Sequence, residues 1–456
     1  MTALLHRQLP GGREPTAEPI GAEDPDRTDP WRVLETWVCG FCLVLLGWRG
    51  VFHYQTSYGA VVGLAMLPVW VGAARRFRGA SVFALAGIAA MASGILLAVL
   101  APSRGRSVAL NQFLTDSGLL LVTIITVGVL LWARTIMTRR TVAICYGVGL
   151  LVRLVGTGLG TDNPWKFAFA VPVAVLLLAV ADHLRNRLWT LVALGALGLV
   201  SAFQDSRSLF ATFLLAGILV TWQLRPTKMG KPASWVWTVL LGAALAAAIY
   251  NLATALLVDG YFGETARRRT LTQIQSAGSL ILGGRPEIAA TRALMGHNPL
   301  GFGFGVGPNV FDVGLAKAGM RRINYNPDNN YVEEYMLGGH VELHSTVGDL
   351  WARAGLMGLA LALLVGFLVA RNLADSMHRR EASGLVAFLT CYTGWNLFFS
   401  PQSSALPTLC LTLGLAMIAL PSVAAPGGSP IEGTAPPPDR VLTPRASLPA
   451  PQGSTH

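Results

Sequence analysis

The chain has 456 residues, of which 52% are hydrophobic and 13% are charged, and its formal net charge is +11. Soluble globular proteins carry about 25% charged residues, so this composition excludes an ordinary cytosolic domain, a disordered chain and a disulfide-rich secreted scaffold. The basic residues are mostly arginines and fall in short clusters between apolar runs. That distribution favours a membrane protein over one that binds nucleic acid.

Apolar segments occupy most of the chain after its first 30 residues. Residues 1–30 are rich in Pro, Gly and acidic residues, which predicts a disordered cytosolic N-terminus rather than a signal peptide. A bilayer crossing takes about 17 to 25 residues, so the sequence predicts an all-α polytopic membrane helix bundle with about twelve transmembrane helices. Nine lie in 31–257 and three in 346–422, and residues 423–456 resemble a disordered cytosolic tail. The twelve predicted spans are about 31–48, 58–74, 81–100, 117–133, 141–157, 165–182, 188–204, 208–224, 235–257, 346–370, 382–399 and 404–422.

The basic residues of the short loops predict the orientation of these spans. Cytosolic loops carry an excess of Lys and Arg. With the N-terminus inside, the inner loops hold Arg75, Arg76, Arg78, Arg134, Arg139, Arg140, Arg185, Arg187, Arg225, Lys228, Lys231, Arg371, Arg379 and Arg380. The short outer loops hold only Arg49, Arg104, Arg106, Lys166 and Arg207. The bias predicts a multi-pass protein of the cell membrane with both termini in the cytosol.

Residues 258–345, between spans nine and ten, are too long for a simple connection and are therefore expected to be functional. Their sequence predicts short helices in TARRRTLTQIQSAGSLIL and in RPEIAATRALMG, where Pro286 suits a first helical turn. A glycine-rich turn follows. We expect an extracytoplasmic helical subdomain.

Arginine at the edge of a span is costly and often marks a functional site. Arg207 opens the eighth span and Arg153 lies near the outer end of the fifth, while Arg285 opens the second loop helix. A guanidinium binds phosphate oxygens with two parallel hydrogen bonds, so these arginines suit a lipid-linked diphosphate. Alternatively, Arg207 is an interfacial arginine that reaches lipid headgroups, and Arg153 pairs with Asp116 or Asp162.

Other motifs predict less. The run Arg267–Arg269 is typical of a solvated face or a contact with headgroups. The glycine-rich stretch 301–309 lacks the Lys-Ser/Thr of a nucleotide loop and is better explained as a mobile or tightly turning loop. His340 and His344 have the spacing of a helical zinc pair, but the acid of the HExxH motif is misplaced, so no metal site is predicted. His344, at the outer mouth of the tenth span, has the chemistry of a general base or of a helix-capping histidine.

Taken in order, these features resemble the O-antigen ligase and O-antigen polymerase superfamily. The resemblance rests on SRS at an outer span boundary, GR and PLGFGFG in the large outer loop, and a His before a span that begins LWARAGLMGL. Members of that superfamily are bacterial integral membrane glycosyltransferases that use undecaprenyl-diphosphate-linked glycans. The resemblance covers roughly residues 200–400, and the predicted number of spans extends the resemblance over most of the chain.

The resemblance implies that Arg207 and Arg285 bind the diphosphate and that His344 activates the acceptor hydroxyl. It implies a metal-independent, inverting transfer without cofactors, whose partners are a polyprenyl-diphosphate-linked glycan donor, a glycan or lipid-glycan acceptor and membrane lipids. The chain departs from the family in having Ser345 where Asn is frequent and Arg353 where an acid is frequent.

Two other functions fit the sequence pattern. A polymerase of the same superfamily would extend a second carrier-linked glycan and needs the same residues. A flippase or twelve-span transporter would also bind a lipid-linked glycan, but its halves are expected to repeat, and the longest loop here follows the ninth span instead of the sixth.

Overall fold

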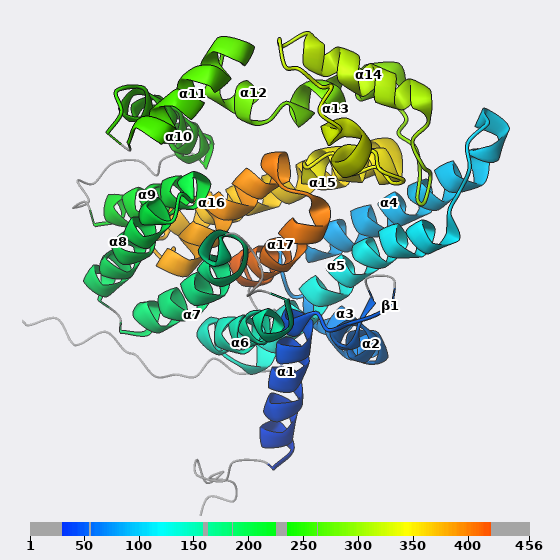
Figure 1. The fold of residues 1–456 in the computed structure, drawn as a ribbon. Helices are drawn as coiled ribbons and strands as arrows, with labels where there is room; N and C mark the ends of the chain where they lie inside the picture. The colour runs from blue at the N-terminus through cyan, green and yellow to red at the C-terminus, as the bar shows by residue number, and fades with distance from the viewer. Residues whose placement is uncertain are drawn as a thin grey trace, which may run out of the picture. The chain divides into compact units, whose positions relative to one another are not determined.

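The computed structural model describes residues 30–53, 56–157, 163–184, 186–224, 235–261 and 263–420. The chain divides into two compact units, Met1–Ala419 and Leu420–His456, and every described helix belongs to the first. The described part is all-helical apart from one short hairpin (Figure 1). The predicted terminal segments and several inner-loop basic residues, including Arg185, Arg225, Lys228 and Lys231, lie outside the described residues.

The first half of the chain alternates helices with short connections. Its elements are α1 Pro30–Trp48, β1 Val51–His53, β2 Thr56–Ser57, α2 Tyr58–Ala65, α3 Leu67–Ala74, α4 Ala80–Leu100, the 3-10 turn η1 Pro102–Arg104, α5 Leu110–Ile136, α6 Arg139–Thr157, the π-helical turn η2 Trp165–Phe169, α7 Ala170–His183, α8 Arg187–Phe203 and α9 Arg207–Trp222. The strands β1 and β2 pair antiparallel.

The second half contains the long connection and the last helices. Its elements are α10 Trp235–Val258, α11 Glu264–Ala277, α12 Leu280–Gly284, α13 Glu287–His297, α14 Val310–Arg321, the π-helical turn η3 Val332–Met336, α15 Thr346–His378, α16 Gly384–Phe399 and α17 Gln402–Ala416. The helices predicted between residues 258 and 345 are therefore present, with Pro286 as the residue that caps α13.

Each predicted span contains helix, but the helices differ in length. Five within the described residues are long and apolar enough to cross a membrane: α1, α4, α5, the continuous η2–α7 segment and α15. Four apolar segments, including α8, α9 and α16, are shorter. The second predicted span breaks at Met66 into α2 and α3 because Pro68 begins the new helix. A membrane helix bundle fits these elements, and the count of about twelve spans stays a prediction.

Large apolar side chains cover much of the outside of these helices. Leu85 and Val99 on α4 are 68% and 69% exposed, and Phe203 at the end of α8 is 82% exposed. A soluble monomer rarely exposes apolar surface on this scale. The exposed faces are therefore suited to lipid.

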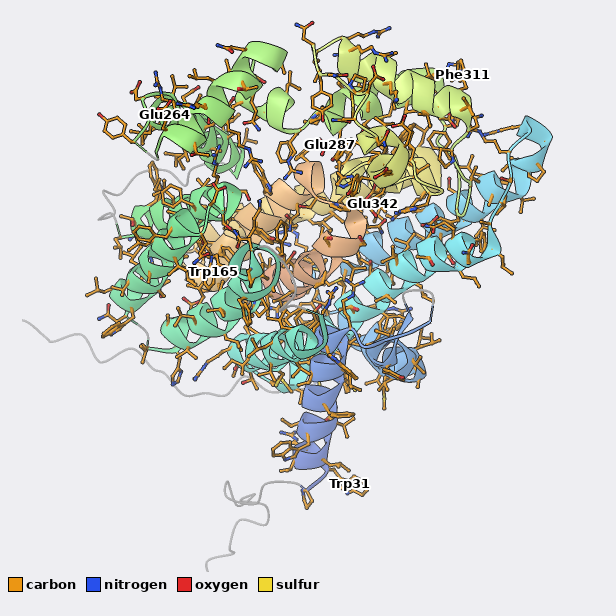
Figure 2. The ribbon with its side chains drawn as sticks, viewed as in Figure 1. Trp31, Trp165, Glu264, Glu287, Phe311 and Glu342 are labelled. Carbon is orange, nitrogen blue, oxygen red and sulfur yellow. The ribbon has the colours of Figure 1, made fainter. Side chains whose placement is uncertain are left out.

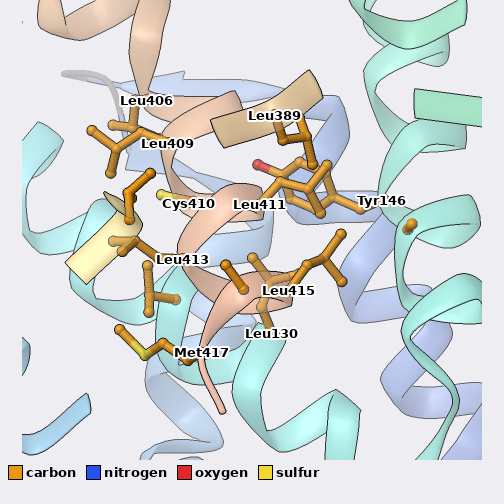
Figure 3. Packing of buried hydrophobic residues seen from close by; sticks show 14 of the residues in the cluster. Leu130, Tyr146, Leu389, Leu406, Leu409, Cys410, Leu411, Leu413, Leu415 and Met417 are labelled. Carbon is orange, nitrogen blue, oxygen red and sulfur yellow. The ribbon is translucent and has the colours of Figure 1, made fainter. Parts of the chain in front are cut away.

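The buried core centres on α17, which packs against α5, α15 and α16. Figure 3 shows Leu411 and Leu413 of α17 among Leu130 of α5, Tyr146 of α6 and Leu389 of α16. The Tyr146 hydroxyl donates a hydrogen bond to the carbonyl of Pro407 at 3.2 Å, which satisfies both polar groups inside this apolar core.

A kink in α15 anchors the glycine-rich stretch. Gly355 has φ +61° inside the helix, so the carbonyl of Ala352 is released from the helical hydrogen-bond pattern. The N–H groups of Phe302 and Gly303 donate to this carbonyl at 2.8 and 3.1 Å. Gly303 has φ +111°, and a Cβ there would lie 2.7 Å from the backbone nitrogen of Ala98 on α4. The stretch is thus a tight, buried turn.

Candidate functional site

Arg207 stands at the first residue of α9, after a sharp turn from α8. Asp205 has φ +48° in that turn, and its Oδ1 lies 3.3 Å from Nε of Arg207. Nη1 of Arg207 donates to Oγ1 of Thr270 on α11 at 3.5 Å. The side chain of Arg207 is 34% exposed. The arginine therefore joins the end of a predicted span to the segment 258–345 and keeps a solvent-accessible part.

Arg207, Arg269 and Arg285 all lie within electrostatic range of Lys166. Lys166, in η2, interacts electrostatically with Asp205, Arg207, Arg269 and Arg285. We call Lys166, Arg207, Arg269 and Arg285 the basic cluster. These four positive charges repel one another, so the cluster is suited to binding an anion.

Local contacts hold Lys166 at this position. The side-chain amide of Asn163 donates to the carbonyl of Gln204 at 2.6 Å. Nε1 of Trp165, labelled in Figure 2, donates to Oγ of Ser201 at 3.0 Å. These two bonds tie the start of η2 to the end of α8, and so they bring the loop that carries Lys166 beside the turn that carries Arg207.

Tyr331 lies beside His344 and within electrostatic range of Arg285. The Tyr331 and His344 ring centroids are 6.0 Å apart, and Arg285 interacts electrostatically with Tyr331. The Tyr331 hydroxyl donates to Oε1 of Glu287 at 2.6 Å. Burial, and then the negative charge of Glu287, raise the pKa of Tyr331, so its hydroxyl keeps its proton and this bond. Glu287 is labelled in Figure 2 at the start of α13.

The backbone of His344 is held in an uncommon conformation. Its φ is +54°, in the left-handed region that only a few per cent of non-glycine residues adopt. The N–H of the preceding Leu343 donates to Oδ1 of Asp349 at 2.7 Å, and the following Ser345 caps α15 by accepting from the N–H of Gly348 at 3.2 Å. Nδ1 of His344 lies 3.3 Å from the carbonyl oxygen of Glu342. A proton on Nδ1 would leave Nε2 free to accept one.

A buried polar network supports this start of α15. Asp349 also accepts from the N–H of Gln402 at 2.8 Å, and the Gln402 side chain accepts from Arg353 at 2.9 Å. Nε of Arg353 lies 3.1 Å from Oδ1 of Asp116 on α5, and both side chains are 5% exposed. The other oxygen of Asp116 accepts from the N–H of Gly305 at 2.9 Å. Charged groups thus bind α5, α15, α17 and the glycine-rich turn together.

Arg153 has different surroundings from the basic cluster. It interacts electrostatically with Arg49 and Tyr146. The anticipated partner Asp116 pairs with Arg353 instead, and the other anticipated partner, Asp162, lies outside the described residues. The predicted role of Arg153 in substrate binding therefore gains no support from the basic cluster.

The members of the run Arg267–Arg269 contact different groups, and so do His340 and His344. Arg267 and Arg268 pair with Glu264 at 3.4 and 3.0 Å, whereas Arg269 belongs to the basic cluster. His340 pairs with Glu342 at 3.7 Å, and residues 337–345 are not helical, so His340 and His344 do not share a helix face. Within the described part of the chain, no three His, Cys, Asp or Glu side chains are grouped to hold a metal ion.

The sequence reasoning missed several of these residues. The sequence marks Lys166 only as a charge that bears on orientation and Glu287 only as part of a helix, and it gives no signal for Tyr331 or Asp349. Lys166 could have been noticed, since it is one of few basic residues in the short outer loops.

Comparisons with protein-family models, with curated proteins and with solved structures find no match to the chain.

Proposed function

We propose that the chain is a membrane glycosyltransferase of the O-antigen ligase type. It transfers a glycan from a polyprenyl-diphosphate carrier to an acceptor hydroxyl at the outer face of the cytoplasmic membrane. The observation that carries the proposal is the position of Arg207 and Arg285 around Lys166, with the His344 ring 6.0 Å from Tyr331, whose hydroxyl donates to Glu287 just after Arg285. Multi-pass topology with both termini in the cytosol belongs to the same proposal.

The proposed reaction uses the basic cluster on the leaving group. The acceptor hydroxyl oxygen attacks the anomeric carbon of the donor sugar, and the bond from that carbon to the diphosphate oxygen breaks. The proton of the hydroxyl passes to Nε2 of His344, and the electron pair leaves with the polyprenyl diphosphate. Arg207, Arg285, Arg269 and Lys166 stabilise the negative charge that develops on the diphosphate. Attack opposite the leaving group inverts the configuration of the anomeric carbon.

Glycan transfer by purified protein in lipid nanodiscs tests this proposal. Arg207→Ala, Arg285→Ala and His344→Ala should each lower the transfer rate by about 100-fold or more, the usual loss when a transition-state donor or a general base is removed. Arg207→Lys should also be slow, because a point charge cannot replace the two parallel hydrogen bonds of a guanidinium.

Arg268→Ala is the matched control, since Arg268 lies next to the basic cluster in sequence but is 79% exposed and pairs with Glu264. It should transfer glycan like the wild type. Wild-type rates in Arg207→Ala, Arg285→Ala and His344→Ala together would refute the proposal.

Ligase and polymerase differ in their acceptor. Labelled lipid-linked glycan should be given to the protein without any other acceptor. A ligase leaves the label at its original length, whereas a polymerase joins the units into longer chains.

A further inference from the structure

An apolar groove of about 780 Å³ runs between α8 and α9. Its α8 wall includes Gly195, Gly198 and Leu199, and its α9 wall includes Phe210 and Gly217. The groove is open to the outside of the bundle, where Leu199 is 58% exposed. Neither wall contributes a charged side chain.

Arg207 lies in line with the α9 wall of this groove. Phe210, Leu214, Gly217 and Thr221 follow Arg207 at intervals of three or four residues, which places all five on one face of the helix. The lining of α9 continues to Trp222, so the groove extends about 18 Å from Phe210 at 1.5 Å per residue. The hydrocarbon core of a bilayer is about 30 Å thick. The groove thus leads from the basic cluster through much of the apolar layer.

Glycines make the groove wide. A Cβ added at Gly195 or at Gly217 would meet no heavy atom within 4 Å, so nothing in the described structure fills the space in front of them. Glycine lowers helix stability by about 1 kcal/mol relative to alanine. The packing between α8 and α9 does not require glycine at position 195 or 217.

We propose that the groove binds the isoprenoid chain of the lipid-linked donor while the basic cluster binds its diphosphate. This inference rests on the proposed function and adds the binding site of the lipid. A polyprenyl diphosphate joins a doubly ionisable anion to a long apolar chain, and the α9 face joins Arg207 to a long apolar groove in the same order. A second protein copy would bury the groove without using the adjacent cations, so the charge at its outer end favours the lipid.

Filling the groove tests the inference. The double variant Gly195→Leu/Gly217→Leu places two leucine side chains in the open space and increases the helix propensity of both helices. Binding of two probes, a long-chain polyprenyl diphosphate and geranyl diphosphate, is measured in nanodiscs. The wild type should bind the long chain more tightly. The double variant should lose about tenfold in affinity for the long chain and bind geranyl diphosphate within about twofold of the wild type.

Gly72→Leu on α3 is the matched control, because a Cβ there also meets no heavy atom within 4 Å and the site is exposed. It should bind both probes like the wild type. Equal long-chain affinity in the wild type and the filled variant would overturn the inference and indicate that ordinary membrane lipids occupy the groove. Equal loss of both probes would also overturn it. Chain-length-dependent binding without any glycan transfer would instead remove the proposed function and leave the groove assignment intact.

Discussion

Arg207 combines an ion pair, a hydrogen bond to another segment and partial exposure. With Lys166, Arg269 and Arg285 in electrostatic range, its charge is incompletely balanced by Asp205. A bound diphosphate would relieve the mutual repulsion of these cations. Ser206, next to Arg207, adds a buried hydroxyl for which the described residues offer no hydrogen-bond partner.

His340 and Glu342 form a pair whose stabilising effect depends on pH. Contact with Glu342 raises the pKa of His340 above its usual 6.5, and the same contact lowers the pKa of Glu342 below its usual 4.5. His344 and Arg353 also lower the pKa of Glu342. The pair contributes most between pH 4.5 and 6.5, where the histidine is protonated and the glutamate is ionised. The contribution is lost above this range as His340 deprotonates, and below it as Glu342 protonates.

His340→Ala should therefore lower the Tm more near pH 5.5 than near pH 8.5, measured by thermal unfolding in detergent. The pair is partly exposed, so its contribution is about 0.5 kcal/mol after screening by solvent. In a Glu342→Gln background the effect of His340→Ala should no longer depend on pH in this way. An effect that is larger at pH 8.5 would contradict the assigned pair.

Contacts at the N-terminal end of α15 hold the backbone around His344. Ser345 caps the helix, Asp349 holds the backbone on both sides of the site, and the kink at Gly355 receives the glycine-rich turn. The ion pair of Arg353 with Asp116 lies inside this arrangement. Breaking a buried pair leaves one charge without compensation, whereas removing both charges is frequently tolerated.

Asp116→Leu alone should lower the free energy of unfolding by about 3 to 5 kcal/mol because it removes the ion-pair partner of the buried Arg353 guanidinium. The double variant Asp116→Leu/Arg353→Met should recover much of this loss. Unfolding of both proteins in detergent measures the difference. A double variant less stable than Asp116→Leu would show that the ion pair is not the dominant contact of these residues.

Helices and individual arginines could be predicted from the sequence, but most contacts of the site could not. Arg207 and Arg285 stand out in the sequence as candidates because the predicted topology does not explain them. Tyr331 and Glu287 are 44 residues apart, and Arg353 meets an acid on another helix, so neither contact leaves a local pattern. His340 and His344 are four residues apart, but this spacing aligns side chains only in a helix, and residues 337–345 are not helical.

The described chain places apolar side chains both in its core and on its surface. Residues 258–345 connect two predicted spans and carry Arg269, Arg285 and His344, while Lys166 lies in η2 and Arg207 at the start of α9. The candidate site is therefore assembled from segments that are distant in sequence. The basic cluster beside the apolar groove between α8 and α9 is the central feature of the proposed function.

Binding of labelled polyprenyl diphosphate to the purified protein in nanodiscs tests that feature most directly. We predict that the double variant Arg207→Ala/Arg285→Ala binds polyprenyl diphosphate about 100-fold more weakly than the wild type does. Hydrogen bonds to charged groups contribute about 1.5 to 3 kcal/mol each. Arg268→Ala should bind like the wild type. Equal affinity of the wild type and the double variant for polyprenyl diphosphate would contradict the account.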